Sequence, residues 1–155
     1  MNRLVQCIAA IALLVATSAT RAETHRVDDS RSQVLGTSLR LKPIGPLAHG
    51  NRMNIVTGTI DVIVRLDVSR WKARKGRIYM TLPDQSAGSV TATWTTRGQL
   101  LPGAVRNGGR TLVYAGLVGS DMLEDTLRLT LQGDERHMPF DKQLAFGFEI
   151  DLDSP

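Results

Sequence analysis

The sequence predicts an all-β fold, namely an antiparallel β-sandwich of about seven strands with the size of an immunoglobulin-like domain. Three observations indicate this fold. Apolar and polar residues alternate with a period of two along most of the chain, no stretch keeps a long apolar stripe of helical period, and glycine, proline and asparagine separate the alternating runs. A small closed β-barrel is the alternative, because barrels show the same pattern.

The alternating runs define the expected strands. They cover residues 35–41, 56–68, 78–82, 90–95, 111–118, 127–131 and 144–152. The fifth run is apolar on both sides, which is typical of a central strand. The last strand, from Gln143 to Leu152, is expected either to pair with a partner or to occupy a critical core position. Residues 119–125 are expected to form one helical turn, capped by Ser120 or Asp121.

The first 22 residues have the layout of a secretory signal peptide, with a short positive start, an apolar run over residues 4–16 and small residues before Ala22. The run is shorter than the roughly 20 apolar residues that span a bilayer. We therefore expect a signal peptide at 1–22, cut after Ala22 or three residues earlier. A single β-sandwich domain is expected at 23–155, in the periplasm or secreted, with the polar stretch 23–33 as a mobile tether.

The sequence shows no catalytic or metal-binding constellation. Its only cysteine, Cys7, lies in the predicted signal peptide, so neither disulfides nor cysteine-rich zinc sites are expected in the domain. The three histidines, His25, His49 and His137, lack the spacing of metal ligands. No serine matches the nucleophile elbow of hydrolases. We therefore expect a protein that is not an enzyme and that holds no cofactor and no metal.

Charge is distributed unevenly along the chain. Residues 23–120 contain 14 Lys and Arg against 6 Asp and Glu, a net charge of +8, whereas residues 121–155 contain 3 against 9, a net charge of −6. Such asymmetry indicates either an interaction face or basic and acidic segments that are neighbours in the fold. The second interpretation is the plainer one.

A dense basic segment with an interleaved tryptophan is the candidate partner-binding site. Its residues are Arg65, Arg70, Trp71, Lys72, Arg74, Lys75 and Arg77. Export makes a nucleic acid an unsuitable partner, so the anions within reach are lipid headgroups, lipopolysaccharide, acidic glycans and acidic proteins. Trp71 is expected at an edge or on the surface, whereas Trp94 alternates with threonines and is expected in the core. A hairpin loop kept soluble by its charges, with a turn at residues 74–76, is the plainer interpretation.

Acidic residues gather at Asp121, Glu124 and Asp125. Paired carboxylates can act as acid and base in glycoside hydrolysis, or they can bind calcium. The alternating oxygen ligands and central glycine of a calcium loop are absent here. A solvated sheet edge is the favoured interpretation, and the sequence leaves open whether the cluster binds a metal.

One short stretch is similar to a known family. The matching positions are Val27, Asp28, Ser32 and Val34. With them, residues 25–34 resemble the opening of the YceI-like periplasmic isoprenoid-binding barrels, although His25 stands where that family has an aromatic residue and Arg31 where it has histidine. The resemblance implies a barrel that carries an apolar ligand.

The expected function is that of an exported, non-enzymatic binding or assembly subunit of the bacterial envelope, such as an adhesin-like or pilus-associated module. Its partner would be an envelope protein or an anionic surface polymer, and self-association is a further option. After signal cleavage the protein would not be an integral membrane protein. The alternatives are a periplasmic lipid- or isoprenoid-carrying barrel and a hydrolase of cell-surface polymers, which would rely on Glu124 and Asp125.

Overall fold

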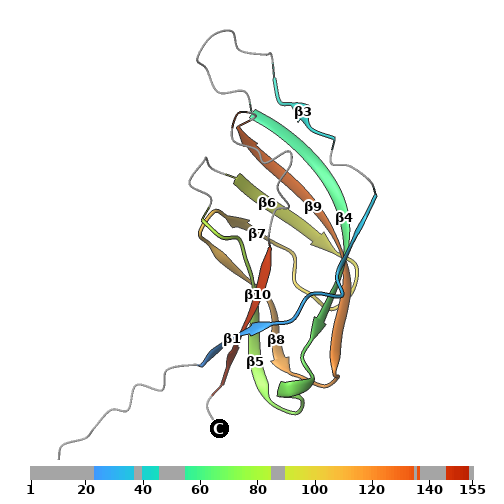
Figure 1. Cartoon of the computed structure of the whole chain (residues 1–155), viewed down its shortest axis with the longest axis vertical. Coiled ribbons are helices and arrows are strands. Elements are labelled where there is room, and N and C mark those ends of the chain that lie inside the picture. The colour runs from blue at the N-terminus through green and yellow to red at the C-terminus, as the bar shows by residue number, and fades with distance from the viewer. Residues whose placement is uncertain are drawn as a thin grey trace, which may run out of the picture.

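Two antiparallel sheets pack against each other in the computed structural model of the chain (Figure 1). The structure describes residues 23–36, 40–45, 55–84, 90–134, 136 and 146–153. The sandwich prediction is confirmed, and the alternative of a closed barrel is wrong because the strands form two separate sheets. The predicted signal peptide at 1–22, as well as His49, His137 and residues 143–145, lie outside the described residues.

One sheet has four strands and the other has six. In the order in which they lie side by side, the strands of the four-stranded sheet are β1 (Thr24–Val27), β10 (Gly147–Leu152), β5 (Lys75–Thr81) and β8 (Arg110–Leu117). Those of the six-stranded sheet are β2 (Gln33–Leu35), β4 (Ile55–Asp67), β9 (Met122–Asp134), β6 (Val90–Thr96) and β7 (Gly103–Arg106), and β3 (Lys42–Pro43) also pairs with β4. A short 3₁₀ turn, η1 (Ser69–Trp71), leads from β4 to β5.

The core lies between the sheets and follows the period-two pattern of the sequence. Leu66 on β4, Leu127 on β9 and Ile150 on β10 are fully buried, and Trp94 is buried as expected. The indole Nε1–H of Trp94 donates to the carbonyl oxygen of Leu101 at 2.9 Å, which satisfies its one polar group. The buried positions therefore confirm the inward sides predicted for these strands.

The longest pair of strands is β4 with β9, which are in register from Ile55 opposite Asp134 to Asp67 opposite Met122. The helical turn expected at residues 119–125 is therefore wrong, since residues 119–121 form a non-helical bend and β9 begins at Met122. Residues 122–125 continue β9 because β4 supplies their backbone partners and the core takes up Leu123. The expected strand at 127–131 is correct but too short.

The expected central strand, β8, lies at the edge of the four-stranded sheet. Only Val113 of this strand is fully buried, and Leu117 is 54% exposed. The segment that follows β6 covers part of the outer edge of β8, where the backbone N–H of Leu101 donates to the carbonyl oxygen of Val113 at 2.7 Å. That segment continues into β7, which pairs with β6.

The stretch 23–33, expected to be a mobile tether, instead closes one side of the sandwich. β1 pairs with β10 and buries Val27 completely. The chain then crosses to the other sheet, where the N–H of Asp67 donates to the carbonyl oxygen of Asp28 at 2.9 Å. Because β1 and β5 occupy both edges of β10, the expected pairing of the last strand with a partner is wrong, and its core role is confirmed.

Candidate functional site

The basic segment forms a tight turn at one end of the sandwich, between β4 and β5 (Figure 1). We call residues 69–75 the basic turn. Its backbone is fixed on both sides, because the N–H of Arg74 donates to the carbonyl oxygen of Trp71 at 3.0 Å and the N–H of Ala73 donates to that of Val118 at 2.8 Å. Val118 in return donates its N–H to the carbonyl oxygen of Arg74 at 2.9 Å. The turn expected at residues 74–76 thus lies slightly earlier, since Lys75 and Gly76 already belong to β5.

Trp71 anchors this turn from below, so the prediction that it lies at an edge or on the surface is wrong. Its side chain is 7% exposed and belongs to the core. The ring of His25 on β1 lies against it, with 5.8 Å between the ring centroids. The period-two alternation ends at Val68, and the short 3₁₀ turn then directs the indole inward, which no spacing in the sequence reveals.

Three cations of the predicted site are engaged with carboxylates. Arg65 Nε lies 2.6 Å from an oxygen of Glu124, Lys72 Nζ lies 2.9 Å from Asp121, and an Arg77 nitrogen lies 2.9 Å from Asp153, as these ion pairs show. All three carboxylates belong to the acidic C-terminal part of the chain. The opposite charges of the two parts therefore meet in the fold, as the second interpretation of the charge asymmetry expects.

The remaining three cations of the segment, Arg70, Arg74 and Lys75, are exposed. Within the described part of the chain, none of them takes part in an ion pair. They fall within six residues on a turn whose backbone is hydrogen-bonded. The arrangement therefore holds positive charge at a fixed place, where it can attract an anionic partner.

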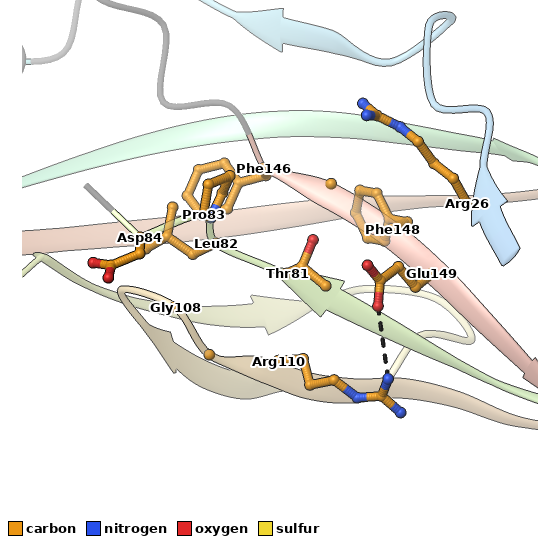
Figure 2. A pocket seen from close by; sticks show the side chains of 12 residues that line it. Arg26, Thr81, Leu82, Pro83, Asp84, Gly108, Arg110, Phe146, Phe148 and Glu149 are labelled. Atoms are coloured by element: carbon orange, nitrogen blue, oxygen red, sulfur yellow. Dashed lines mark ion pairs between the residues drawn. The ribbon is translucent and has the colours of Figure 1, made fainter. Parts of the chain in front are cut away.

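A groove of about 490 Å³ opens at the other end of the four-stranded sheet (Figure 2). Phe146, Pro83 and Leu82 form one side, and Arg26 and Glu149 lie toward the other. The volume is typical of a small-ligand site. Its charged groups, which also include Arg110 and Asp84, are of both signs in equal number, so its charge does not select a class of ligand.

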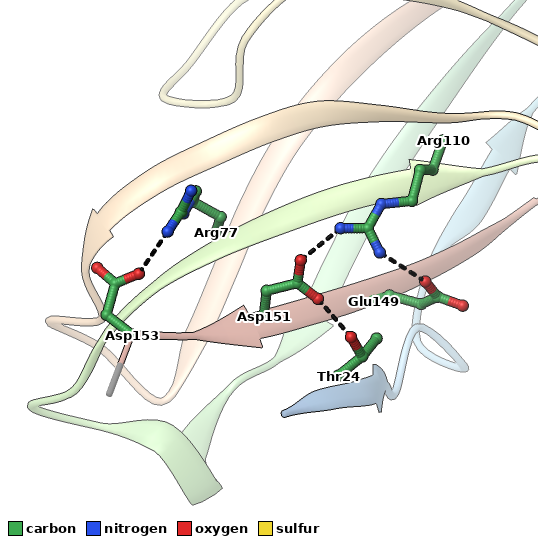
Figure 3. Close-up of polar contacts among 6 residues, drawn as sticks. All are labelled: Thr24, Arg77, Arg110, Glu149, Asp151 and Asp153. Carbon is green, nitrogen blue, oxygen red and sulfur yellow. Dashed lines mark hydrogen bonds and ion pairs between the residues drawn. The ribbon is translucent and has the colours of Figure 1, made fainter. Parts of the chain in front are cut away.

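The outer face of the four-stranded sheet carries charges that compensate one another (Figure 3). The guanidinium of Arg110 contacts Asp151 and lies 3.6 Å from Glu149, and it also stacks 3.9 Å from the centre of the Tyr79 ring. Burial alone raises the pKa of Asp151, but hydrogen bonds from Thr24 and Arg110 outweigh it and hold that pKa below its ordinary value. This face therefore presents paired charges, unlike the basic turn.

A second cross-strand pair gives the stability a pH dependence. Arg128 on β9 lies opposite Asp61 on β4 and donates two hydrogen bonds to its carboxylate, at 2.8 and 3.0 Å. These bonds hold the pKa of Asp61 below its ordinary value of 3.8. Because the pKa of Asp61 is lower in the folded state, its carboxylate stabilises the folded state at pH values above the unfolded-state pKa. This contribution is lost as the pH falls through the folded-state pKa.

We therefore expect the urea midpoint of the protein to fall as the pH drops below about 5, and Asp61→Asn to reduce this loss while lowering the midpoint at pH 7. The two curves should converge at low pH, where Asp61 is protonated in both states. Arg128→Gln should act in the same way, and the double variant should add nothing further. Parallel curves for the wild type and Asp61→Asn at every pH would contradict this linkage.

The acidic cluster of the sequence does not form one site. Asp125 faces inward and is 5% exposed, and its carboxylate accepts the backbone N–H groups of Gly98 at 2.7 Å and Leu100 at 2.8 Å, together with those of residues 97 and 126. Glu124 points to the opposite face of β9, where it pairs with Arg65. Asp125 therefore holds the loop after β6. Its position in the alternation of β9 could have revealed that it faces the core.

The two carboxylates proposed as an acid and base pair thus point away from each other. Among the residues that the structure describes, no three His, Cys, Asp or Glu side chains are grouped to hold a metal ion. The same part of the chain contains no helix with the length and apolar character needed to cross a membrane. Comparisons with protein-family models, with curated proteins and with solved structures find no match to this chain.

Proposed function

We propose that the protein is an exported, non-enzymatic binding or assembly subunit of the bacterial envelope, an adhesin-like or pilus-associated module, and that it binds an anionic partner through the basic turn. One observation carries the proposal: Arg70, Arg74 and Lys75 are exposed and stand outside the ion pairs of the described residues, on a turn that the core holds in place. The signal peptide predicted from the sequence supports the envelope location.

The rigid backbone of the turn favours binding. Association costs free energy for every segment that becomes ordered, and a turn that is already fixed avoids most of that cost. Here the buried Trp71 and the hydrogen bonds to Val118 fix the backbone before any partner arrives. Only the three long side chains remain to be ordered, so the turn is suited to electrostatic docking.

The geometry supports the two alternative functions less well. A lipid carrier needs an interior larger than its own side chains can fill. The space between the two sheets is occupied instead by side chains such as Leu66, Ile78 and Met80, which are almost completely buried. A hydrolase built on Glu124 and Asp125 would need the two carboxylates to converge, and they lie on opposite faces of one strand.

The test is the retention of the protein on its own washed envelope. The combined variant Arg70→Ala, Arg74→Ala and Lys75→Ala removes two arginines and one lysine that are exposed. We expect the wild type to stay bound at about 0.05 M salt and to be released at about 0.5 M, because salt screens exposed charges. The variant should be released already at the lower concentration.

The matched control is the combined variant Arg40→Ala, Lys42→Ala and Arg106→Ala, which also removes two exposed arginines and one exposed lysine. Lys42 lies opposite Thr57, at the end of β4 that is about 33 Å from the basic turn, given about 3.3 Å per residue over ten residues. The control should be retained like the wild type. Equal release of both variants would mean that net charge, and not the basic turn, causes binding.

A further inference from the structure

The chain enters the sandwich beside the basic turn. At the start of β1, the carbonyl oxygen of Glu23 accepts the N–H of Leu152 at 3.4 Å, and that of Lys75 accepts the N–H of Asp153 at 3.1 Å. Only β10 separates Glu23 from Lys75, so the two backbones lie about 10 Å apart, which is two strand spacings. Figure 1 shows the start of β1, the end of β10 and the start of β5 at the same end of the molecule.

A side-chain contact connects the same two places. His25, the second residue of β1, lies against Trp71, which anchors the basic turn. The position of the turn relative to the point where the chain enters is thus fixed by packing as well as by strand pairing. Glu23 directly follows the predicted signal peptide, whose apolar run inserts into the membrane during export.

From this placement we propose that the basic turn binds the anionic phospholipid surface of the membrane from which the chain emerges. The inference rests on the proposed function and names the partner of the same site. With one residue between the predicted signal peptide and β1, the end of the sandwich that carries Arg70, Arg74 and Lys75 faces the bilayer as the domain folds. Phospholipid phosphates are the first anions that these cations meet.

The charges at the end of the sandwich that carries the basic turn favour a weak, peripheral contact with an anionic surface. Asp121 and Asp153 are engaged with Lys72 and Arg77, so the nearby carboxylates left are Glu23 and Asp67, together with Asp28 beside Asp67, which has Arg26 and Arg31 near it. Asp67 is turned to Ser69, whose N–H and hydroxyl donate to it at 3.1 and 2.6 Å. Cleavage after Ala22 would place an α-ammonium group on Glu23 and offset its carboxylate. A positive surplus therefore remains toward an anionic surface.

The experiment uses the protein purified from its own host and two kinds of vesicle, phosphatidylcholine alone and phosphatidylcholine mixed with phosphatidylglycerol. We expect co-sedimentation with the mixed vesicles only, and its loss at about 0.5 M salt. Each cation near an anionic surface contributes roughly a fivefold gain in partitioning. The variant Arg70→Ala, Arg74→Ala and Lys75→Ala should therefore bind roughly a hundredfold more weakly, whereas the control Arg40→Ala, Lys42→Ala and Arg106→Ala should lose no more than a few-fold.

Three outcomes overturn the inference. Equal binding to both kinds of vesicle would show that the protein binds by apolar insertion. Equal losses of vesicle binding in the two variants would show that net charge causes the binding. Absence of vesicle binding, while the wild type still stays on its own envelope and the basic-turn variant does not, would assign the turn to an acidic protein or glycan partner. In that last case the proposed function stands and only the lipid inference fails. If both variants stay on the envelope as well as the wild type does, the proposed function itself is contradicted.

Discussion

We expect Asp125→Ala to lower the free energy of unfolding by about 3–5 kcal/mol. The carboxylate is 5% exposed and accepts four backbone N–H groups, three of them from the loop that follows β6. Hydrogen bonds to a charged group contribute about 1.5–3 kcal/mol each, and donors left without an acceptor add a desolvation cost. Alanine removes the side chain whose hydrogen bonds tie this loop to β9.

Urea denaturation of Asp125→Ala and of Glu124→Ala measures the effect against a neighbour in the same strand. Glu124 is 55% exposed and forms a surface ion pair, so its replacement should cost less than about 1 kcal/mol. Gly98→Ala offers an independent check, because a Cβ there would lie 3.0 Å from the carboxyl carbon of Asp125 and push the loop away from it. A cost for Asp125→Ala no larger than that for Glu124→Ala would show that the carboxylate does not hold the loop.

The second large effect is expected for Phe148→Ala, at about 3–5 kcal/mol, because the ring is 3% exposed and its loss leaves a cavity between the sheets. β10 lies between β1 and β5, so its neighbours on both sides are fixed by strand pairing and cannot collapse easily into the space. The adjacent Glu149 points to the outer face and is 37% exposed, and Glu149→Ala should cost less than about 1 kcal/mol.

The comparison of these two residues tests the register of β10. A shift of one residue would exchange the inner and outer faces of the strand. Thermal or urea unfolding of the two variants therefore shows which of the two side chains faces the core, since that one loses more free energy of unfolding when it is replaced. Similar costs for Phe148→Ala and Glu149→Ala would contradict the register in which Phe148 lies opposite Met80.

The alternation of residue types was sufficient to predict the long strands but not their neighbours. In β10 every second residue is apolar and buried, and in β4 the same alternation places Val56, Val64 and Leu66 in the core, with Ile60 and Val62 half-buried against it. β1 and β7 have four residues each, too few for a recognisable period, and each becomes a strand because a long neighbour offers backbone partners. The edge position of β8 depends on the order of strands in the sheet, which local pattern does not contain.

The candidate site could be predicted only in outline. The density of cations at residues 65–77 is visible in the sequence, but which of them carry a compensating carboxylate depends on register. Arg65 is neutralised because β4 and β9 place it directly opposite Glu124. The inward direction of Trp71 follows from the 3₁₀ turn. Trp71 was expected to contact a partner, and it instead anchors the basic turn in the core.

The most direct test of the proposed role of the basic turn is a lysine footprint of the protein on its own washed envelope. Lys75 lies at the end of the basic turn and Lys42 on β3 lies at the far end of the six-stranded sheet, and both are exposed in the free protein. Limited acetylation followed by mass spectrometry compares their reactivity with and without envelope. We expect labelling of Lys75 to fall several-fold on binding and labelling of Lys42 to stay unchanged. Protection of Lys42 with Lys75 still reactive would contradict binding through the basic turn.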